Sequence, residues 1–171
     1  MKFYTKQHKY YCGIDLHTKK MYLCILDAGG QIRLHQNIQT DPNGLLNILA
    51  PFREDVVVAV ECMFTWYWIA DLCADHGIPF VLGHALYMKA IHGGKAKNDT
   101  IDAHKIAVLL RGGMLPQAYV YPAEMRATRD LLRRLAGDRD LGLVDALDDR
   151  DDLLLRHGHV SDALLRSEHP P

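Results

Sequence analysis

The 171-residue sequence lacks several features that would place it in a special class of protein. Its four cysteines contain no C-x-x-C pair, which argues against a zinc ribbon and predicts reduced, buried thiols. No apolar run approaches the roughly 18–20 residues that a membrane span needs, and the first twenty residues hold no signal-peptide core. We therefore expect a cytoplasmic protein.

Short metal- and nucleotide-binding motifs are also missing. The ten histidines form no H-x₃-H or H-E-x-x-H pair, and no G-x-x-x-x-G-K-[ST] loop is present. The composition is otherwise ordinary, with 49% hydrophobic and 24% charged residues. A chain of this length and composition can fold around one core of its own.

The charge is unevenly distributed along the chain. Through Gly137 there are 16 Lys and Arg against 12 Asp and Glu, a net charge of +4. Residues 138–171 hold 4 basic against 9 acidic residues, a net charge of −5. The second segment has no aromatic residue and no Lys, so it cannot easily bury enough surface to offset its ordering entropy. We predict one domain over residues 1–137 and a weakly structured acidic tail over residues 138–171.

Hydrophobic periodicity and turn residues predict the order of the elements. The segment 32–38 alternates apolar and polar residues, as a half-exposed strand does, whereas the β-branched run 55–61 is typical of a central strand covered on both faces. Asp41 followed by Pro42 indicates the start of a helix. The predicted elements are strands over 10–16, 21–26 and 32–38, a helix from Asp41 to about Pro51, a strand over 55–61, a helix over 65–76, a strand over 78–82 and helices over 84–91, 99–110 and 123–135.

Three strands in succession with short turns predict an antiparallel meander, and the later strands alternate with helices. This is the order of the ribonuclease H-like (RuvC-like) α/β fold, a mixed sheet with helices on both faces. We predict that fold for residues 1–137.

Two predicted strands end in an acidic residue. Asp15 lies near the end of the first strand, on the face shared with Tyr11 and Gly13, and Glu61 ends the run 55–61. A carboxylate in an apolar strand is costly unless it is paired, hydrogen-bonded or bound to a metal. Strand ends in open α/β sheets are also where sites form.

A second acidic pair lies three residues apart. Asp99 and Asp102 share one face of the helix predicted over 99–110, where they would repel each other unless a cation lay between them. Taken alone, Asp99 as a helix cap and Asp102 as a first-turn acid are the better explanation. Together with Asp15 and Glu61, they form a set that could hold two Mg²⁺ ions about 4 Å apart. We predict that the four carboxylates converge on one site.

These segments resemble a known family. Gly13-Ile14-Asp15-Leu16-His17, the strand end Val60-Glu61 and the run Lys97-Asn98-Asp99-Thr100-Ile101-Asp102-Ala103 are similar to the amino-terminal domain of DEDD transposases of the insertion-sequence one-ten family. The likeness covers about residues 8–135.

The resemblance implies a RuvC-like catalytic domain in which Asp15, Glu61, Asp99 and Asp102 fill the four acidic positions. It implies Mg²⁺, with Mn²⁺ as a substitute, and a DNA substrate. It further implies a structured guide RNA from the element, a homo-oligomer in the full-length family, and a serine nucleophile on a carboxy-terminal domain.

The chain departs from this pattern after residue 135. Its only serines, Ser161 and Ser167, lie in the acidic segment without a glycine-rich helical context. We therefore expect a truncated or frameshifted copy, and whether it is an enzyme on its own stays open.

Other residues are weaker candidates. Basic side chains around the second acidic pair could bind phosphates, although a solvated face explains each one equally well. The aromatic run from Trp66 to Trp68 could stack on bases, but core packing is favoured, at least for Trp68. His17 and His104 lie close to acids and could tune them, with a surface position the simpler interpretation. The basic candidates are Lys89, Lys95, Lys97, Lys105 and Arg111.

Three functions remain as alternatives. The first is a metal-dependent DNA transposase or recombinase domain, with Holliday-junction resolvases as its nearest relatives. The second is a fragment of an actin-like-fold phosphotransferase, which opens in the same way but needs glycine-rich phosphate loops that are absent here. The third is a nucleic-acid-binding remnant without catalysis.

Overall fold

The computed structural model describes residues 2–62, 66–92 and 99–136. The chain divides into two compact units, residues 1–120 and 121–171, and each is described by itself. The first unit contains all five strands, and the second contains helix α5 (Ala123–Ala136). The predicted boundary at residue 137 and the predicted acidic tail lie outside the described residues.

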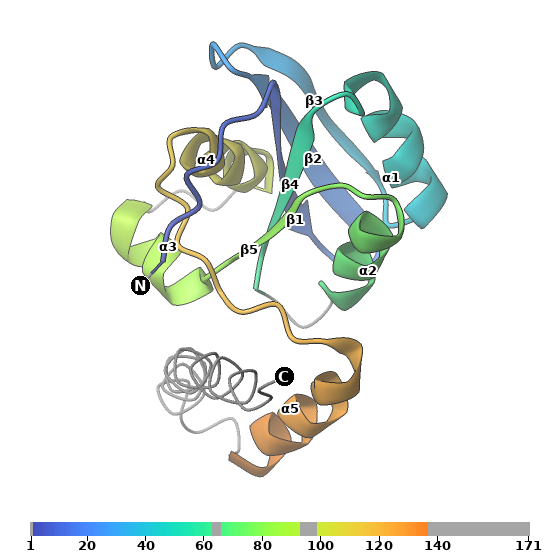
Figure 1. Ribbon diagram of the computed structural model, residues 1–171, viewed down its shortest axis with the longest axis vertical. Coiled ribbons are helices and arrows are strands. Elements are labelled where there is room, and N and C mark those ends of the chain that lie inside the picture. Colours follow the sequence, from blue (N-terminus) through green and yellow to red (C-terminus); the bar gives the residue numbers. More distant parts are fainter. Residues whose placement is uncertain (1, 63–65, 93–98, 137–171) are drawn as a thin grey trace, which may run out of the picture. The chain divides into compact units, whose positions relative to one another are not determined.

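One five-stranded sheet organises the first unit, in the order β3-β2-β1-β4-β5 (Figure 1). β1, β2 and β3 form the predicted antiparallel meander, whereas β4 and β5 run parallel to β1. The prediction of a ribonuclease H-like mixed sheet is therefore confirmed. The strands are β1 (Tyr10–Leu16), β2 (Lys20–Asp27), β3 (Ile32–Gln39), β4 (Val56–Glu61) and β5 (Phe80–Gly83).

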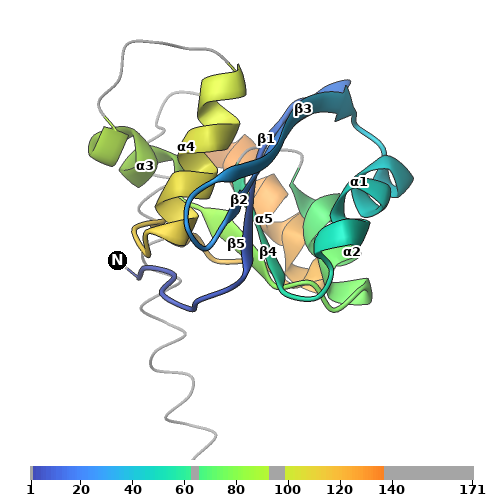
Figure 2. The same cartoon turned by 90° about the horizontal axis from the view of Figure 1, so that it is seen from above.

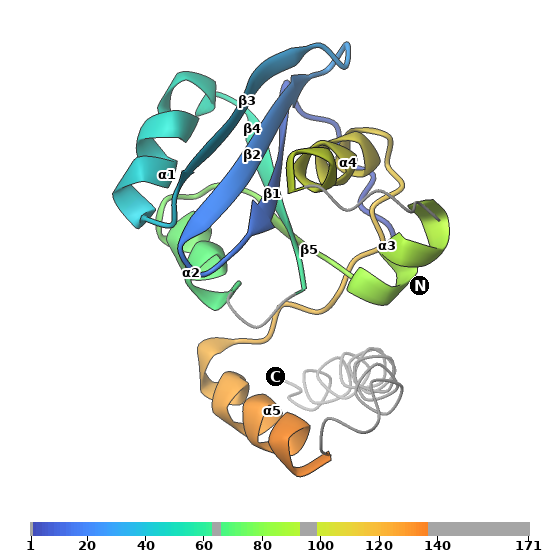
Figure 3. The ribbon, with the colours of Figure 1, turned by 180° about the vertical axis from the view of Figure 1, so that it is seen from behind.

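Helices cover both faces of this sheet, as Figures 2 and 3 show. α1 and α2 pack on one face and α4 on the other, with α3 on the α4 side. No helix in the described residues is both long and apolar enough to cross a bilayer. The helices of this unit are α1 (Pro42–Leu49), the 3₁₀ turn η1 (Ala50–Phe52), α2 (Tyr67–Asp75), α3 (Ala85–His92) and α4 (Asp99–Arg111).

Local sequence chemistry sets the ends of several elements. The Asp41 carboxylate accepts a 2.6 Å hydrogen bond from the Gly44 N–H, which is the predicted cap of α1. Gly77 has a φ of +63° just after α2, a conformation that glycine adopts without steric cost. β5 begins at Phe80 rather than at the predicted residue 78, because the Ile78 N–H bonds to the Cys73 carbonyl and closes α2.

The central strand β1 faces both layers. Its even-numbered residues, such as Ile14, join the core under α1 and α2, whereas Tyr11 belongs to the core under α4. β4 shows the same alternation, with Val58 on the first side and Ala59 on the second. The odd positions of both strands therefore face α4.

A hydrogen-bonded chain ties the amino-terminal segment to the start of the sheet. The Asp55 carboxylate accepts a bond of 2.6 Å from His8 Nδ1 and one of 2.9 Å from the Lys9 N–H. The Tyr4 hydroxyl bonds to His8 Nε2 at 2.7 Å, and the Tyr11 hydroxyl accepts the His8 N–H at 2.8 Å. The segment before β1 is thereby fixed at the amino ends of β1 and β4.

Candidate active site

Two acidic residues end neighbouring parallel strands. The register pairs Ile14 of β1 with Val60 of β4, so Asp15 and Glu61 follow at adjacent positions. Both are odd-numbered residues, and the odd-numbered residues of these strands face α4. Adjacent strands lie about 4.8 Å apart. The side chain of Asp15 is 13% exposed, and Glu61 is half-buried. The structure thus places this predicted pair on one face of the sheet, at the carboxyl ends of two neighbouring strands.

Helix α4 lies unusually close to β1 at Gly13. A Cβ on Gly13 would be 2.4 Å from the Ala103 carbonyl oxygen and 2.5 Å from the Ala107 nitrogen, so only glycine fits there. Asp15 is two residues further along the same face of β1, and Asp102 immediately precedes Ala103 on α4. The close approach therefore fixes the amino-terminal half of α4 over the strand that bears Asp15.

The acidic pair on α4 is described only in part. Asp102 is half-buried, and its carboxylate lies 3.3 Å from Lys105 Nζ, one helical turn further on. Asp99 is the first residue of α4, but its side chain lies outside the described residues. Among the side chains that are described, no group of three His, Cys, Asp or Glu is placed to hold a metal ion. The convergence of all four carboxylates stays a prediction.

Of the two histidines predicted to tune the acids, only His17 contacts one of them among the described side chains. His17 Nε2 lies 3.1 Å from Asp15 Oδ2, which orients that carboxylate. His104 on α4 packs against His35 of β3, with ring centroids 6.3 Å apart. Partial burial, and to a lesser extent the neighbouring His35, lower the pKa of His104, which favours the neutral imidazole.

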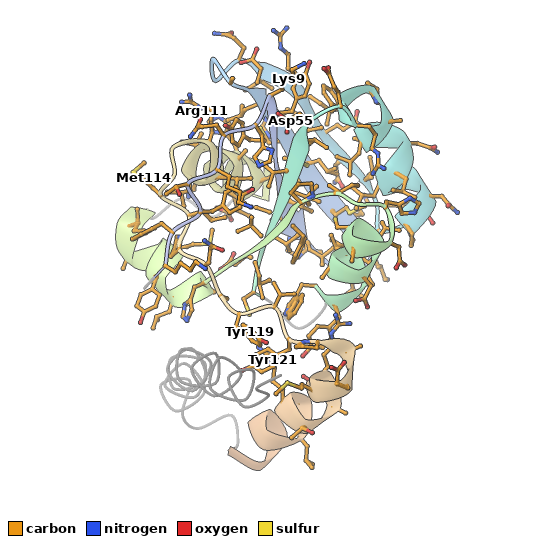
Figure 4. The ribbon with its side chains drawn as sticks, in the orientation of Figure 1. Lys9, Asp55, Arg111, Met114, Tyr119 and Tyr121 are labelled. Carbon is orange, nitrogen blue, oxygen red and sulfur yellow. The ribbon has the colours of Figure 1, made fainter. Side chains whose placement is uncertain are left out.

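Of the predicted basic side chains, the structure describes those of Lys105 and Arg111. Lys105 pairs with Asp102, whereas Arg111 Nη1 donates a 3.2 Å hydrogen bond to the Ala28 carbonyl. Figure 4 shows Arg111 at the same end of the unit as Lys9 and Asp55, which is the end of β1 opposite to Asp15. Lys95 and Lys97 lie outside the described residues, as does the side chain of Lys89.

The aromatic run before and within α2 belongs mainly to the core. Trp66 is fully buried, with its ring centroid 4.4 Å from that of Tyr67. Trp68, for which core packing was predicted, is half-buried and packs against the same core cluster. Trp66 therefore has no face available for a base.

Sequence reasoning missed His84. The register pairs Glu61 with Gly83, so His84 follows β5 directly beside the end of β4. Its side chain is 6% exposed, its ring lies 4.4 Å from that of Tyr87, and neither ring nitrogen has a hydrogen-bond partner in the described part of the chain. A single histidine after a short apolar strand gives no sequence signal, because only the pairing of β4 with β5 brings it to this edge.

The strand order, with an antiparallel meander followed by two parallel strands, defines a ribonuclease H-like α/β domain. A sequence model of the family of IS110-type DEDD transposases, whose description is transposase, matches residues 12–140. This match covers most of the chain, so the chain belongs to that family of transposases.

Two solved structures are also similar to this chain. T. thermophilus RuvC in complex with Holliday junction substrate is 18% identical with a TM-score of 0.44, over 64% of this chain and 99% of that one. The large terminase nuclease from thermophilic phage G20c is 17% identical with a TM-score of 0.38, over 67% of this chain and 61% of that one. No curated protein matches the sequence.

Proposed function

We propose that this chain supplies the RuvC-like catalytic domain of a DNA transposase that uses Mg²⁺ for phosphodiester chemistry. Asp15, Glu61, Asp99 and Asp102 are the acids that hold the metal in this proposal. The observation that carries it is the pair of carboxylates at adjacent positions of β1 and β4, on the face that α4 covers.

The donor set fits a hard divalent cation. Mg²⁺ keeps several waters and is commonly held by one or two carboxylates together with substrate phosphates, so it does not need a cage of three protein ligands. Asp15 and Glu61 supply two carboxylates from rigid strand ends, and Mn²⁺ fits the same oxygen donors. When bound there, the metal would stabilise the charge that develops on the attacking and leaving oxygens of a phosphodiester.

The neighbouring side chains have supporting parts in this proposal. His17 Nε2 lies 3.1 Å from Asp15 Oδ2 and orients that carboxylate. Lys105 neutralises Asp102 until a metal replaces it at that carboxylate. Gly13 keeps α4 in place, so the acids on the helix and on the strand keep a fixed separation.

Other parts of the reaction rest on the family resemblance alone. We infer DNA as the substrate, with the attacking group supplied by a serine-bearing domain outside residues 12–140. The guide RNA and the homo-oligomer stay predictions. Membership of a transposase family favours this assignment over the phosphotransferase alternative.

Metal titration tests the proposal. Calorimetry with Mn²⁺ and Mg²⁺ should show binding to the wild-type chain, and Asp15→Asn or Glu61→Gln should weaken it at least about tenfold, because each removes one of two charged ligands. Asp75→Asn is the matched control, since Asp75 is exposed at the end of α2, on the other face of the sheet. Equal metal binding by all four proteins would contradict the proposal.

A further inference from the structure

The turn between β1 and β2 presents cations beside the acidic pair. β1 ends at Leu16 and β2 begins at Lys20, and residues 17–20 are all exposed. In the described part of the chain, neither Lys19 nor Lys20 is in an ion pair, whereas Lys9 at the other end of β1 pairs with Glu54. Two ammonium groups that pair with no described carboxylate therefore lie at the end of β1 where Asp15 lies.

This turn is held rigidly. The His17 N–H donates to the Lys20 carbonyl at 3.1 Å, and the Thr40 N–H donates to the Lys19 carbonyl at 3.1 Å. The Thr40 hydroxyl donates to the His17 carbonyl at 2.8 Å. The backbone of both lysines is thus fixed before any ligand arrives, which lowers the entropy lost on binding.

The turn is continuous with the acidic pair through side chains. His17 contacts the Asp15 carboxylate, and Asp15 is paired across the sheet with Tyr22 of β2. The turn and the Asp15 carboxylate are therefore neighbours at this end of β1.

Planar side chains of β2 and of the edge strand β3 lie on the same face of the sheet as Asp15. Tyr22 is paired with Asn37 of β3, and its ring packs edge-on against that of His35, with centroids 5.8 Å apart. His35 and Asn37 are exposed, and His35 also contacts His104 of α4. The ring contacts of Tyr22, His35 and His104 join β2, β3 and α4, and aromatic side chains of this kind serve as stacking platforms for bases.

We propose that the turn at residues 17–20 and the ring pair Tyr22–His35 form a track for the DNA strand that leaves the acidic pair. Lys19 and Lys20 bind successive phosphates, and the two rings contact the bases. This assignment rests on the proposed function, because it takes the scissile phosphodiester to lie at Asp15 and Glu61. It adds the cations of the β1–β2 turn to the predicted cations of α4, Lys105 and Arg111.

Binding of a fluorescein-labelled oligothymidylate to the full chain tests the track. Lys19→Gln/Lys20→Gln should bind roughly tenfold more weakly, and the slope of log Kd against log salt should fall by about 1.4, which is about 0.7 for each lost phosphate contact. Lys6→Gln/Lys9→Gln is the matched control, because it removes the same charge beyond the opposite end of β1 and should bind like the wild type.

A stacking variant separates the two parts of the track. His35→Ala should weaken binding about fivefold with no change in the salt slope, because stacking releases no counterions. Full-strength binding by His35→Ala would remove the rings from the track. Equal losses in both double-lysine variants, or no loss in either, would overturn the phosphate part while leaving the proposed function intact. A wild-type chain that binds no oligonucleotide would overturn the proposed function as well.

Discussion

Gly13 of β1 and Ala103 of α4 are in backbone contact, and a Cβ on Gly13 would lie 2.4 Å from the Ala103 carbonyl oxygen. Helices normally pack on sheets through their side chains, at a distance that leaves room for a Cβ. Here the two backbones meet, and the acids that flank the contact, Asp15 and Asp102, are held by rigid elements rather than by loops. Sites held in this way keep their geometry more closely.

Gly13→Ala should destabilise the domain by about 3 kcal/mol, because the helix must move away from the strand to admit a methyl group. Urea unfolding measures the change. Gly44→Ala is the control: its Cβ would meet only the Asp41 side chain, at 3.2 Å, and should change stability by less than about 1 kcal/mol. Similar stabilities for both variants would show that α4 does not lie against β1 as described.

Asp55→Asn should lower the melting temperature at neutral pH and flatten its decline in acid. The hydrogen bond from His8, followed by that from the Lys9 N–H, lowers the pKa of Asp55 below its ordinary 3.8. A carboxyl group whose pKa is lower in the folded than in the unfolded state stabilises the fold. This stabilisation is complete above the unfolded-state pKa and is lost as the pH falls through the folded-state pKa. Melting curves between neutral pH and acid, with Asp75→Asn as control, measure this. Parallel wild-type and variant curves would contradict it.

Cys62 should be the one thiol that reacts rapidly with Ellman's reagent in the native protein. No disulfide joins the four cysteines, and Cys62 alone is half-buried. Burial raises the pKa of Cys24 to about 11 and that of Cys73 to about 12, and it also raises that of the fully buried Cys12. The reaction should therefore show one fast equivalent, which Cys62→Ser removes. Two or more fast equivalents would contradict this burial.

Lys105→Gln should tighten Mn²⁺ binding by up to about fivefold. Lys105 competes with a metal for the Asp102 carboxylate, and a partly exposed ion pair of this kind contributes about 0.2–1 kcal/mol. Calorimetry on the wild type and the variant gives the ratio of the two Kd values. The variant Asp102→Asn/Lys105→Gln should lose the gain. If it kept the gain, the effect would come from general charge rather than from the pair.

Most of the fold could be predicted from local patterns in the sequence. The alternation over residues 32–38 predicted the half-exposed edge strand β3, and the β-branched run predicted β4, which is buried from Val56 to Val60. Asp41 with Pro42 gave the start of α1. These signals are local because the burial of a strand and the capping of a helix depend on residues a few positions apart.

The site could be predicted only where a strand end marks it. Asp15 and Glu61 were predicted at the ends of their strands, and the register places them at adjacent positions. Three further features depend on how distant segments pair. These are the contact of Gly13 with α4, the position of His84 beside Glu61, and the position of Arg111 at the opposite end of β1 from Asp15. No local pattern contains that information. The roles of all four acids stay predictions that the metal titration tests.

The contact between Gly13 and Ala103 also has a consequence for the order of folding. It joins residues ninety positions apart, whereas the hairpin of β1 and β2 joins neighbours in the chain. Closing so long a loop is slow compared with forming a hairpin, so the meander should form early and α4 should dock late. A chain emerging from the ribosome therefore exposes this face of β1 long before α4 can cover it. The close contact at Gly13 forms only after almost the whole first unit has been synthesised.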